Sequence, residues 1–150
     1  MRFIALAVSV IAPASTAYAN TLADFAGTWV GGGSIAHRTG PNEKVTCRMV
    51  YTPAGADMRV SIRCSRQDGR FEASAHLKQQ GTSITGTWSV SGYNADGALR
   101  GTRSGNSMNL AVSGSFAGTL ALSVNGRTQS MSFTPSGGSE FTRLSANMSR

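Results

Sequence analysis

Apolar and polar residues alternate along most of the chain, and this period of two restricts the fold more than any other feature. In the stretch 45–51, Val45, Cys47, Met49 and Tyr51 are apolar, and the residues between them are mostly polar. Such alternation is typical of β-strands that turn one face to the core and the other to solvent. No segment shows a helical period, so the sequence predicts an all-β fold.

The first residues of the chain predict export. Met1-Arg2 supplies a short positive start, residues 3–12 are apolar, and Ala17-Tyr18-Ala19 presents small residues at the two positions that signal peptidase reads. We therefore expect a signal peptide over 1–19, cleavage after Ala19 and one mature domain over 20–150 in the periplasm or outside the cell. The apolar run is too short for a transmembrane helix, and no later stretch is longer.

Cys47 and Cys64 are the only cysteines, and in an oxidising compartment such a pair predicts a disulfide. A hairpin turn centred between Gly55 and Ala56 places the two residues opposite each other. The same register pairs Met49 with Ile62 and Tyr51 with Val60. All three pairs lie on the apolar face, so the predicted register rests on more than the cysteines.

Turn signals divide the rest of the chain into further strands. Asp68-Gly69 predicts a two-residue hairpin, which pairs Cys64 with Ala73, Ile62 with Ala75 and Val60 with Leu77. Further turns are expected at 81–82, 92–97, 105–106, 115–117, 125–126 and 135–139. With a first strand over 28–36, this pattern predicts a single-domain, antiparallel up-and-down meander of about ten strands. Closure into a small barrel removes the exposed edges of an open sheet.

The Gly27-Thr28-Trp29 opening of the first strand resembles that of the calycin barrels, which include the lipocalins, fatty-acid-binding proteins and avidins. The lipocalin resemblance implies that Trp29 closes one barrel end beneath a basic residue from late in the chain, for which Arg143 is the candidate. The opening and the single disulfide also resemble the small secreted metalloprotease-inhibitor barrels. That resemblance implies that residues 20–24 plug a protease.

Catalytic chemistry has little support in the sequence. His37 and His76 are the only histidines, and neither has a metal-ligand spacing to the other or to the cysteines. His76 is expected on the outer face beside Ser61, as a solvated histidine. The seven carboxylates are scattered, no Gly-x-Ser-x-Gly motif occurs, and Gly31-Gly32-Gly33 lacks the lysine of a phosphate loop and is expected to kink its strand. We expect a non-enzyme without a metal or cofactor.

A basic outer face is one candidate binding surface. Without Arg2 the mature chain has thirteen Lys and Arg residues against seven Asp and Glu. In the predicted register Arg48 faces Arg63, and Arg59 neighbours Lys78, so these residues form a candidate site for anionic lipid or acidic polysaccharide of the envelope. A solvated face with splayed side chains is the alternative. Nucleic acid is not expected, because no aromatic residues interleave with the arginines.

The barrel interior is the other candidate site. Trp29, Tyr51 and Trp88 are expected to face inward among small residues such as Ala73 and Gly86, a mixture that can enclose a small apolar or amphipathic ligand. The alternative is a filled core. The sequence therefore leaves three functions open: a ligand-binding barrel, an envelope interaction module that uses the arginine face, and a protease inhibitor.

Overall fold

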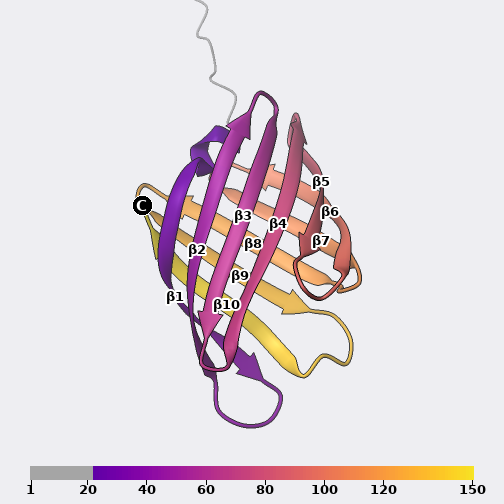
Figure 1. Ribbon diagram of the computed structural model, residues 1–150. Coiled ribbons are helices and arrows are strands. Elements are labelled where there is room, and N and C mark those ends of the chain that lie inside the picture. Colours follow the sequence, from indigo (N-terminus) through magenta and orange to yellow (C-terminus); the bar gives the residue numbers. More distant parts are fainter. Residues whose placement is uncertain (1–21) are drawn as a thin grey trace, which may run out of the picture.

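The alternating stretches form strands that pair with their neighbours in sequence (Figure 1). The computed structural model describes residues 22–150. The elements in chain order are η1 (Leu22–Phe25), β1 (Gly27–His37), β2 (Glu43–Ala54), β3 (Asp57–Arg66), β4 (Gly69–Gln80), β5 (Ser83–Val90), β6 (Ala95–Ser104), β7 (Ser107–Gly114), β8 (Gly118–Asn125), β9 (Thr128–Pro135) and β10 (Phe141–Ser149). The predicted signal peptide, 1–19, and Asn20 lie outside the described residues.

The sheet is a closed antiparallel barrel, because β1 pairs with β2 on one side and with β10 on the other. Each strand from β2 to β9 pairs with its two neighbours in sequence, so the topology is up-and-down throughout. Closure leaves no strand with an unpaired edge in the described part of the chain. The predictions of an all-β fold, about ten strands and a closed meander are confirmed. Within residues 22–150, no helix has the length and apolar character needed to cross a membrane.

The first predicted hairpin has the expected register. Met49 pairs with Ile62 and Tyr51 with Val60, and the Cys47–Cys64 disulfide joins β2 to β3 with a Cα–Cα distance of 4.1 Å. Both cysteines are buried on the inward face. The disulfide prediction is therefore confirmed.

The predicted pairing of β3 with β4 is wrong by two residues. Cys64 pairs with Phe71, Ile62 with Ala73, and Val60 with Ala75, because the turn consists of Gln67 and Asp68 and Gly69 already belongs to β4. A slip of two residues leaves every side chain on the same face of the sheet. The apolar pattern is equally satisfied in both registers, and only the position of the turn decides between them.

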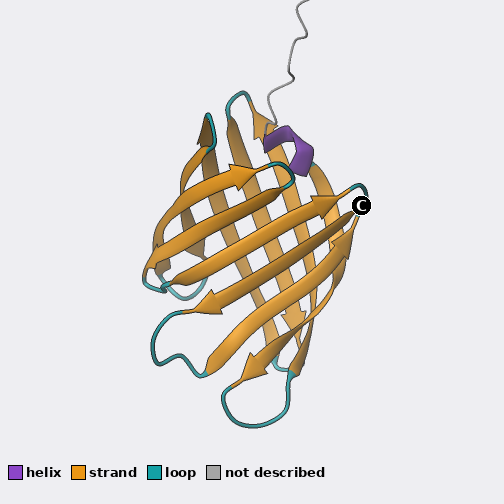
Figure 2. Ribbon diagram, turned by 180° about the vertical axis from the view of Figure 1, so that it is seen from behind, coloured by secondary structure: helices purple, strands orange, loops and turns teal. Residues whose placement is uncertain are grey.

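The two ends of the barrel differ. η1 lies at the end where β1 begins, next to the C-terminus (Figure 2), and its Leu22 and Phe25 are buried. We call this the closed end. Inward side chains near it are fully covered: Met58 and Ile84 are 0% exposed, and Met108 is 1% exposed. The core therefore extends to this end.

Candidate functional site at the open end of the barrel

Trp29 and Arg150 hold the closed end together. The Trp29 indole is buried and donates a hydrogen bond of 2.8 Å to the Phe25 carbonyl, and the Arg150 guanidinium lies 4.5 Å from the centre of the indole ring. Arg143, the residue suggested by the lipocalin resemblance, does not pack across Trp29. It lies near the other end of β10 opposite Ala36 and is exposed, so the last residue of the chain takes that place.

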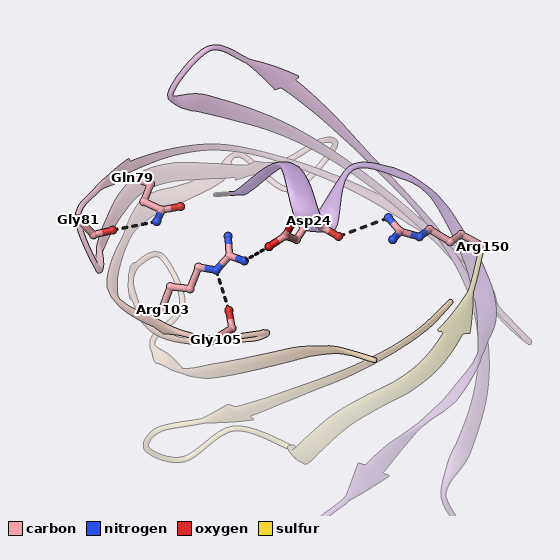
Figure 3. Close-up of polar contacts among 6 residues, drawn as sticks. All are labelled: Asp24, Gln79, Gly81, Arg103, Gly105 and Arg150. Carbon is pink, nitrogen blue, oxygen red and sulfur yellow. Dashed lines mark hydrogen bonds and ion pairs between the residues drawn. The ribbon is translucent and has the colours of Figure 1, made fainter. Parts of the chain in front are cut away.

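Two arginines anchor η1 from opposite sides (Figure 3). Arg103 is 3% exposed; its guanidinium lies 2.6 Å from the Asp24 carboxylate, and its Nε donates to the Gly105 carbonyl at 2.9 Å. Arg150 donates to the Asp24 carbonyl at 3.4 Å and to the carbonyl of Ala26, the residue after η1, at 2.6 Å. Charge-assisted hydrogen bonds of this kind are stronger than neutral ones. The closed end is therefore a structural seal.

A buried polar pair lies inside the barrel behind this seal. The Gln129 side chain is 1% exposed and donates to the Tyr51 hydroxyl at 2.9 Å. Burial raises the pKa of the Tyr51 hydroxyl, and the hydrogen bond from Gln129 offsets part of that effect. The phenol is therefore held in its neutral form as part of the core.

At the opposite end of the barrel the inward side chains are less completely buried, and we call it the open end. It is formed by the loops 38–42, 67–68, 91–94, 115–117 and 136–140. Large inward-facing side chains at this end, among them Phe71, Leu120 and Leu144, are only partly buried. On the same strands the residues before and after each of these side chains face outward, so these apolar side chains point into the barrel near its end.

Four aromatic residues form one side of the open end, and we call them the aromatic wall. Trp88 stacks on Phe116 with ring centres 5.8 Å apart and an angle of 22°, and the centres of Phe133 and Phe141 are 6.2 Å apart. Phe116 is 50% exposed. The Trp88 indole donates to the Ser113 carbonyl at 3.0 Å, which fixes its orientation. The wall offers a partly solvated aromatic surface to an apolar molecule.

A polar cluster occupies another part of the same end. The Glu43 carboxylate lies 3.3 Å from the His37 ring and 3.7 Å from the Arg66 guanidinium. All three residues are on the inward face, since His37 pairs with Phe141, Glu43 with the buried Ile35, and Arg66 with the buried Val45. The open end therefore combines an aromatic wall with charged, hydrogen-bonding groups. Among residues 22–150, no group of three or more His, Cys, Asp and Glu residues is arranged to hold a metal ion.

The predicted interior residues are divided between the two ends. Trp29 and Tyr51 are buried near the closed end, where the rings of Tyr51 and Phe25 are 6.1 Å apart. Trp88 alone belongs to the open end. The predicted inhibitory segment 20–24 is described only from Leu22 onward, and Leu22 and Asp24 are engaged in the seal of the closed end.

The predicted arginine face is changed by the corrected register. Arg48 does face Arg63, but Arg63 also forms an ion pair of 3.2 Å with Glu72. Arg59 faces His76, whereas Lys78 faces Asp57, so the predicted neighbours Arg59 and Lys78 are not paired. For the same reason His76 lies beside Arg59 rather than Ser61, and its ring is 3.1 Å from the Asp57 carboxylate.

Sequence reasoning missed most of the open end. Glu43 lies two residues before Val45 and Arg66 lies two residues after Cys64, so the alternation along these strands places both on the inward face. This alternation was the sequence signal available for the polar cluster. Phe116 lies in a turn, where the alternation of strands does not predict which way a side chain points. Its stacking on Trp88 depends on the conformation of the 115–117 loop.

Comparisons with known proteins identify the fold. No protein-family model matches the chain, and no curated protein matches it. Rv2717c from M. tuberculosis has a TM-score of 0.68 and 14% sequence identity, over 86% of this chain and 94% of that chain. The S-type phycobiliprotein lyase CPES from Guillardia theta has a TM-score of 0.60 and 13% identity, over 86% of this chain and 91% of that chain. This chain is thus similar in fold to both of these proteins.

Proposed function

We propose that this protein is an exported, non-enzymatic barrel that binds a small amphipathic molecule at its open end. The observation that carries the proposal is the presence of the aromatic wall and the polar cluster at the same end. Small-molecule sites are mostly apolar and contain a few polar groups that orient the ligand. The apolar part of the ligand would contact Trp88 and Phe133, and its polar group would hydrogen-bond with the His37–Glu43–Arg66 cluster.

The contacts of the two histidines and the two cysteines support a non-enzymatic role. Among the described residues, His37 and His76 each pair with a carboxylate, and neither hydrogen-bonds to a serine. Both cysteines are in the disulfide. A nucleophile activated by an adjacent base would need such a contact. Export to an oxidising compartment is proposed from the residues of the leader, 1–19, and agrees with the use of a disulfide.

Binding of the dye 1-anilinonaphthalene-8-sulfonate, followed by its fluorescence, tests the site. The dye joins an aromatic body to an anionic group, as the open end requires. Ala73 faces inward beside Val90, and Ser74 is the next residue on the outer face, so Ala73→Phe and Ser74→Phe add the same ring inside and outside the barrel. Ala73→Phe is expected to weaken binding at least about tenfold, and Ser74→Phe less than about twofold.

The polar half of the site has its own matched pair of variants. Arg66→Gln removes the charge of the polar cluster, and Arg70→Gln removes an exposed charge on the outer face of β4. Arg66→Gln is expected to weaken binding of the sulfonate by about threefold to tenfold, and Arg70→Gln to leave it unchanged. Equal affinities for the wild type, Ala73→Phe and Arg66→Gln contradict binding at the open end. A melting curve for each variant confirms that it is folded.

A further inference from the structure

A shallow groove of about 520 Å³ lies on the outer face of β2, β3, β4 and β5, outside the barrel, and Trp88 is the residue that it shares with the aromatic wall. Its outer-face lining consists of two neighbouring rows across the strands: Val50, Ser61, Ser74 and Ser89, and then Thr52, Arg59, His76 and Thr87. Val60, Ala75 and Trp88, on the same strands, complete the lining. Five of the eight residues in the two rows carry a hydroxyl group, so most of the groove floor consists of short hydroxyl side chains, and Val50, Arg59 and His76 are the exceptions.

Long charged side chains border the groove in the next outward-facing row on each side of these two rows. The row on one side contains Arg48, Arg63 and Glu72, and the row on the other contains Asp57 and Lys78. Side chains on the outer face of a sheet stand perpendicular to it, so the serine and threonine side chains of the floor reach less far from the sheet than the charged side chains of the border. The hollow is therefore a product of the residue pattern along the strands.

Arg59 is the arginine in the lining of this groove, and no carboxylate pairs with it among residues 22–150. Each of the two carboxylates at the border already has a partner, since Glu72 pairs with Arg63 at 3.2 Å and Asp57 lies 3.1 Å from His76, which lines the groove. Within residues 22–150, no carboxylate lies within 4.0 Å of Arg59. Arg59 is exposed, so it can form a charge-assisted, bidentate hydrogen bond with an anion in the groove.

The chemistry of the floor selects among anionic partners. Serine and threonine hydroxyls donate and accept hydrogen bonds, as sugar hydroxyls do, and the Ser74 and Ser89 hydroxyls are already 3.0 Å apart. The exposed large apolar residues of the described chain are Val30, Tyr93 and Phe116, and none of them lines the groove. A flat lipid surface would need such protruding apolar residues, whereas a recessed hydroxyl floor fits a narrow chain of sugars.

We propose that this outer groove is a second binding site, for an acidic polysaccharide chain. A sugar carboxylate or phosphate pairs with Arg59, and neighbouring sugar hydroxyls bond with Ser61, Ser74 and Ser89. The groove has the size range of sites that hold small ligands, about 300–1,000 Å³. The protein would then bind a small molecule inside the barrel while attached to a polysaccharide by its outer wall.

Calorimetric titration in low-salt buffer tests the site with three probes. They are a trimer of galacturonic acid, a neutral trimer of galactose, and vesicles of phosphatidylethanolamine with phosphatidylglycerol. The wild type is expected to bind the acidic trimer at least about tenfold more tightly than the neutral one. Vesicle binding that depends on Arg59, without binding of the acidic trimer, overturns the proposal in favour of a lipid surface. Absence of binding to both anionic probes also overturns it.

Four variants locate the binding. Arg59→Gln removes the groove cation and Ser74→Phe fills the floor, and each is expected to weaken binding of the acidic trimer at least about tenfold. Arg70→Gln removes an equal charge outside the groove, and Ala73→Phe changes only the interior, so each is expected to change affinity less than about twofold. Equal losses for Arg59→Gln and Arg70→Gln contradict the site and indicate diffuse charge attraction. The opposite responses of Ala73→Phe and Ser74→Phe to the dye and to the trimer keep the two proposals separable.

Discussion

Gly31 and Gly33 face the inside of the barrel where β10 leaves no space for a side chain. A Cβ atom at Gly33 would lie 1.9 Å from the Ser145 carbonyl oxygen, and one at Gly31 would lie 2.0 Å from the Asn147 carbonyl oxygen. Gly32 between them faces outward, and its Cβ would lie 3.7 Å from the Val45 carbonyl oxygen. The run of three glycines therefore has two different roles, and only its inward members permit the close approach of β1 to β10.

A pair of alanine substitutions separates these roles. Gly33→Ala is expected to lower the free energy of unfolding by about 3 kcal/mol, because a backbone atom of β10 must move. Gly32→Ala is expected to change it by less than about 1 kcal/mol, since its Cβ makes an ordinary contact. Urea denaturation of both variants measures the difference. Equal effects would show that the close approach of β1 to β10 is not what requires glycine here.

Tyr51 makes the stability of the barrel sensitive to alkaline pH. Burial raises the pKa of its hydroxyl above the ordinary value of 10.0, whereas in the unfolded chain the phenol loses its proton near that value. The stabilising contribution is thus complete below pH 10.0. Above that pH the unfolded chain releases a proton that the folded protein keeps, and unfolding becomes more favourable by up to about 1.4 kcal/mol per pH unit.

Urea denaturation at about pH 9 and about pH 11 checks this dependence. Tyr51→Phe lacks the ionisable group, so it is expected to lose about 1 kcal/mol less than the wild type between the two pH values. Tyr93→Phe is the control, because Tyr93 is 64% exposed, and it is expected to follow the wild type. A loss for Tyr51→Phe equal to that of the wild type would contradict a raised pKa at Tyr51.

At the scale of elements, the β2–β3 hairpin carries the disulfide and supplies part of the outer groove. The bond closes a loop with a sequence separation of 17. Closure of such a loop restricts the unfolded chain and contributes about 3 kcal/mol. It also joins the two strands that carry Val50, Ser61 and Arg59.

Replacement of both cysteines tests this contribution. The double variant Cys47→Ala and Cys64→Ala is expected to unfold with a free energy about 3 kcal/mol below that of the wild type. Reduction of the wild type with a phosphine is expected to produce a similar loss. A loss under about 1 kcal/mol would show that the packing of β2 on β3 holds the hairpin without the bond.

Strand pairing shows where sequence reasoning succeeds and where it stops. The period of two predicts which side chains face inward, and the cysteines together with the turn at Gly55 predict the β2–β3 partners. The β3–β4 partners were not predictable from the same pattern, because a slip of two residues preserves both faces. That slip alone decides that Arg59 faces His76 and that Arg63 has Glu72 as a partner.

At the scale of the whole molecule, the barrel has one sealed end and one open end. The seal depends on contacts between distant parts of the chain, such as Arg103 with Asp24 and Arg150 with Trp29. The open end depends on loop conformations that place Phe116 on Trp88. Alternation predicts a barrel but carries no information about its ends, so the fold was predictable from sequence and most of the candidate site was not.

The central claim is that the open end holds a small molecule. Mass spectrometry under native conditions, on protein isolated gently from the cells that produce it, tests this claim most directly. The wild type and Ser74→Phe are expected to carry the same additional non-protein mass, which is lost on denaturation, and Ala73→Phe is expected to lack it. A wild-type mass equal to that of the polypeptide alone, or an equal additional mass on Ala73→Phe, would contradict the claim.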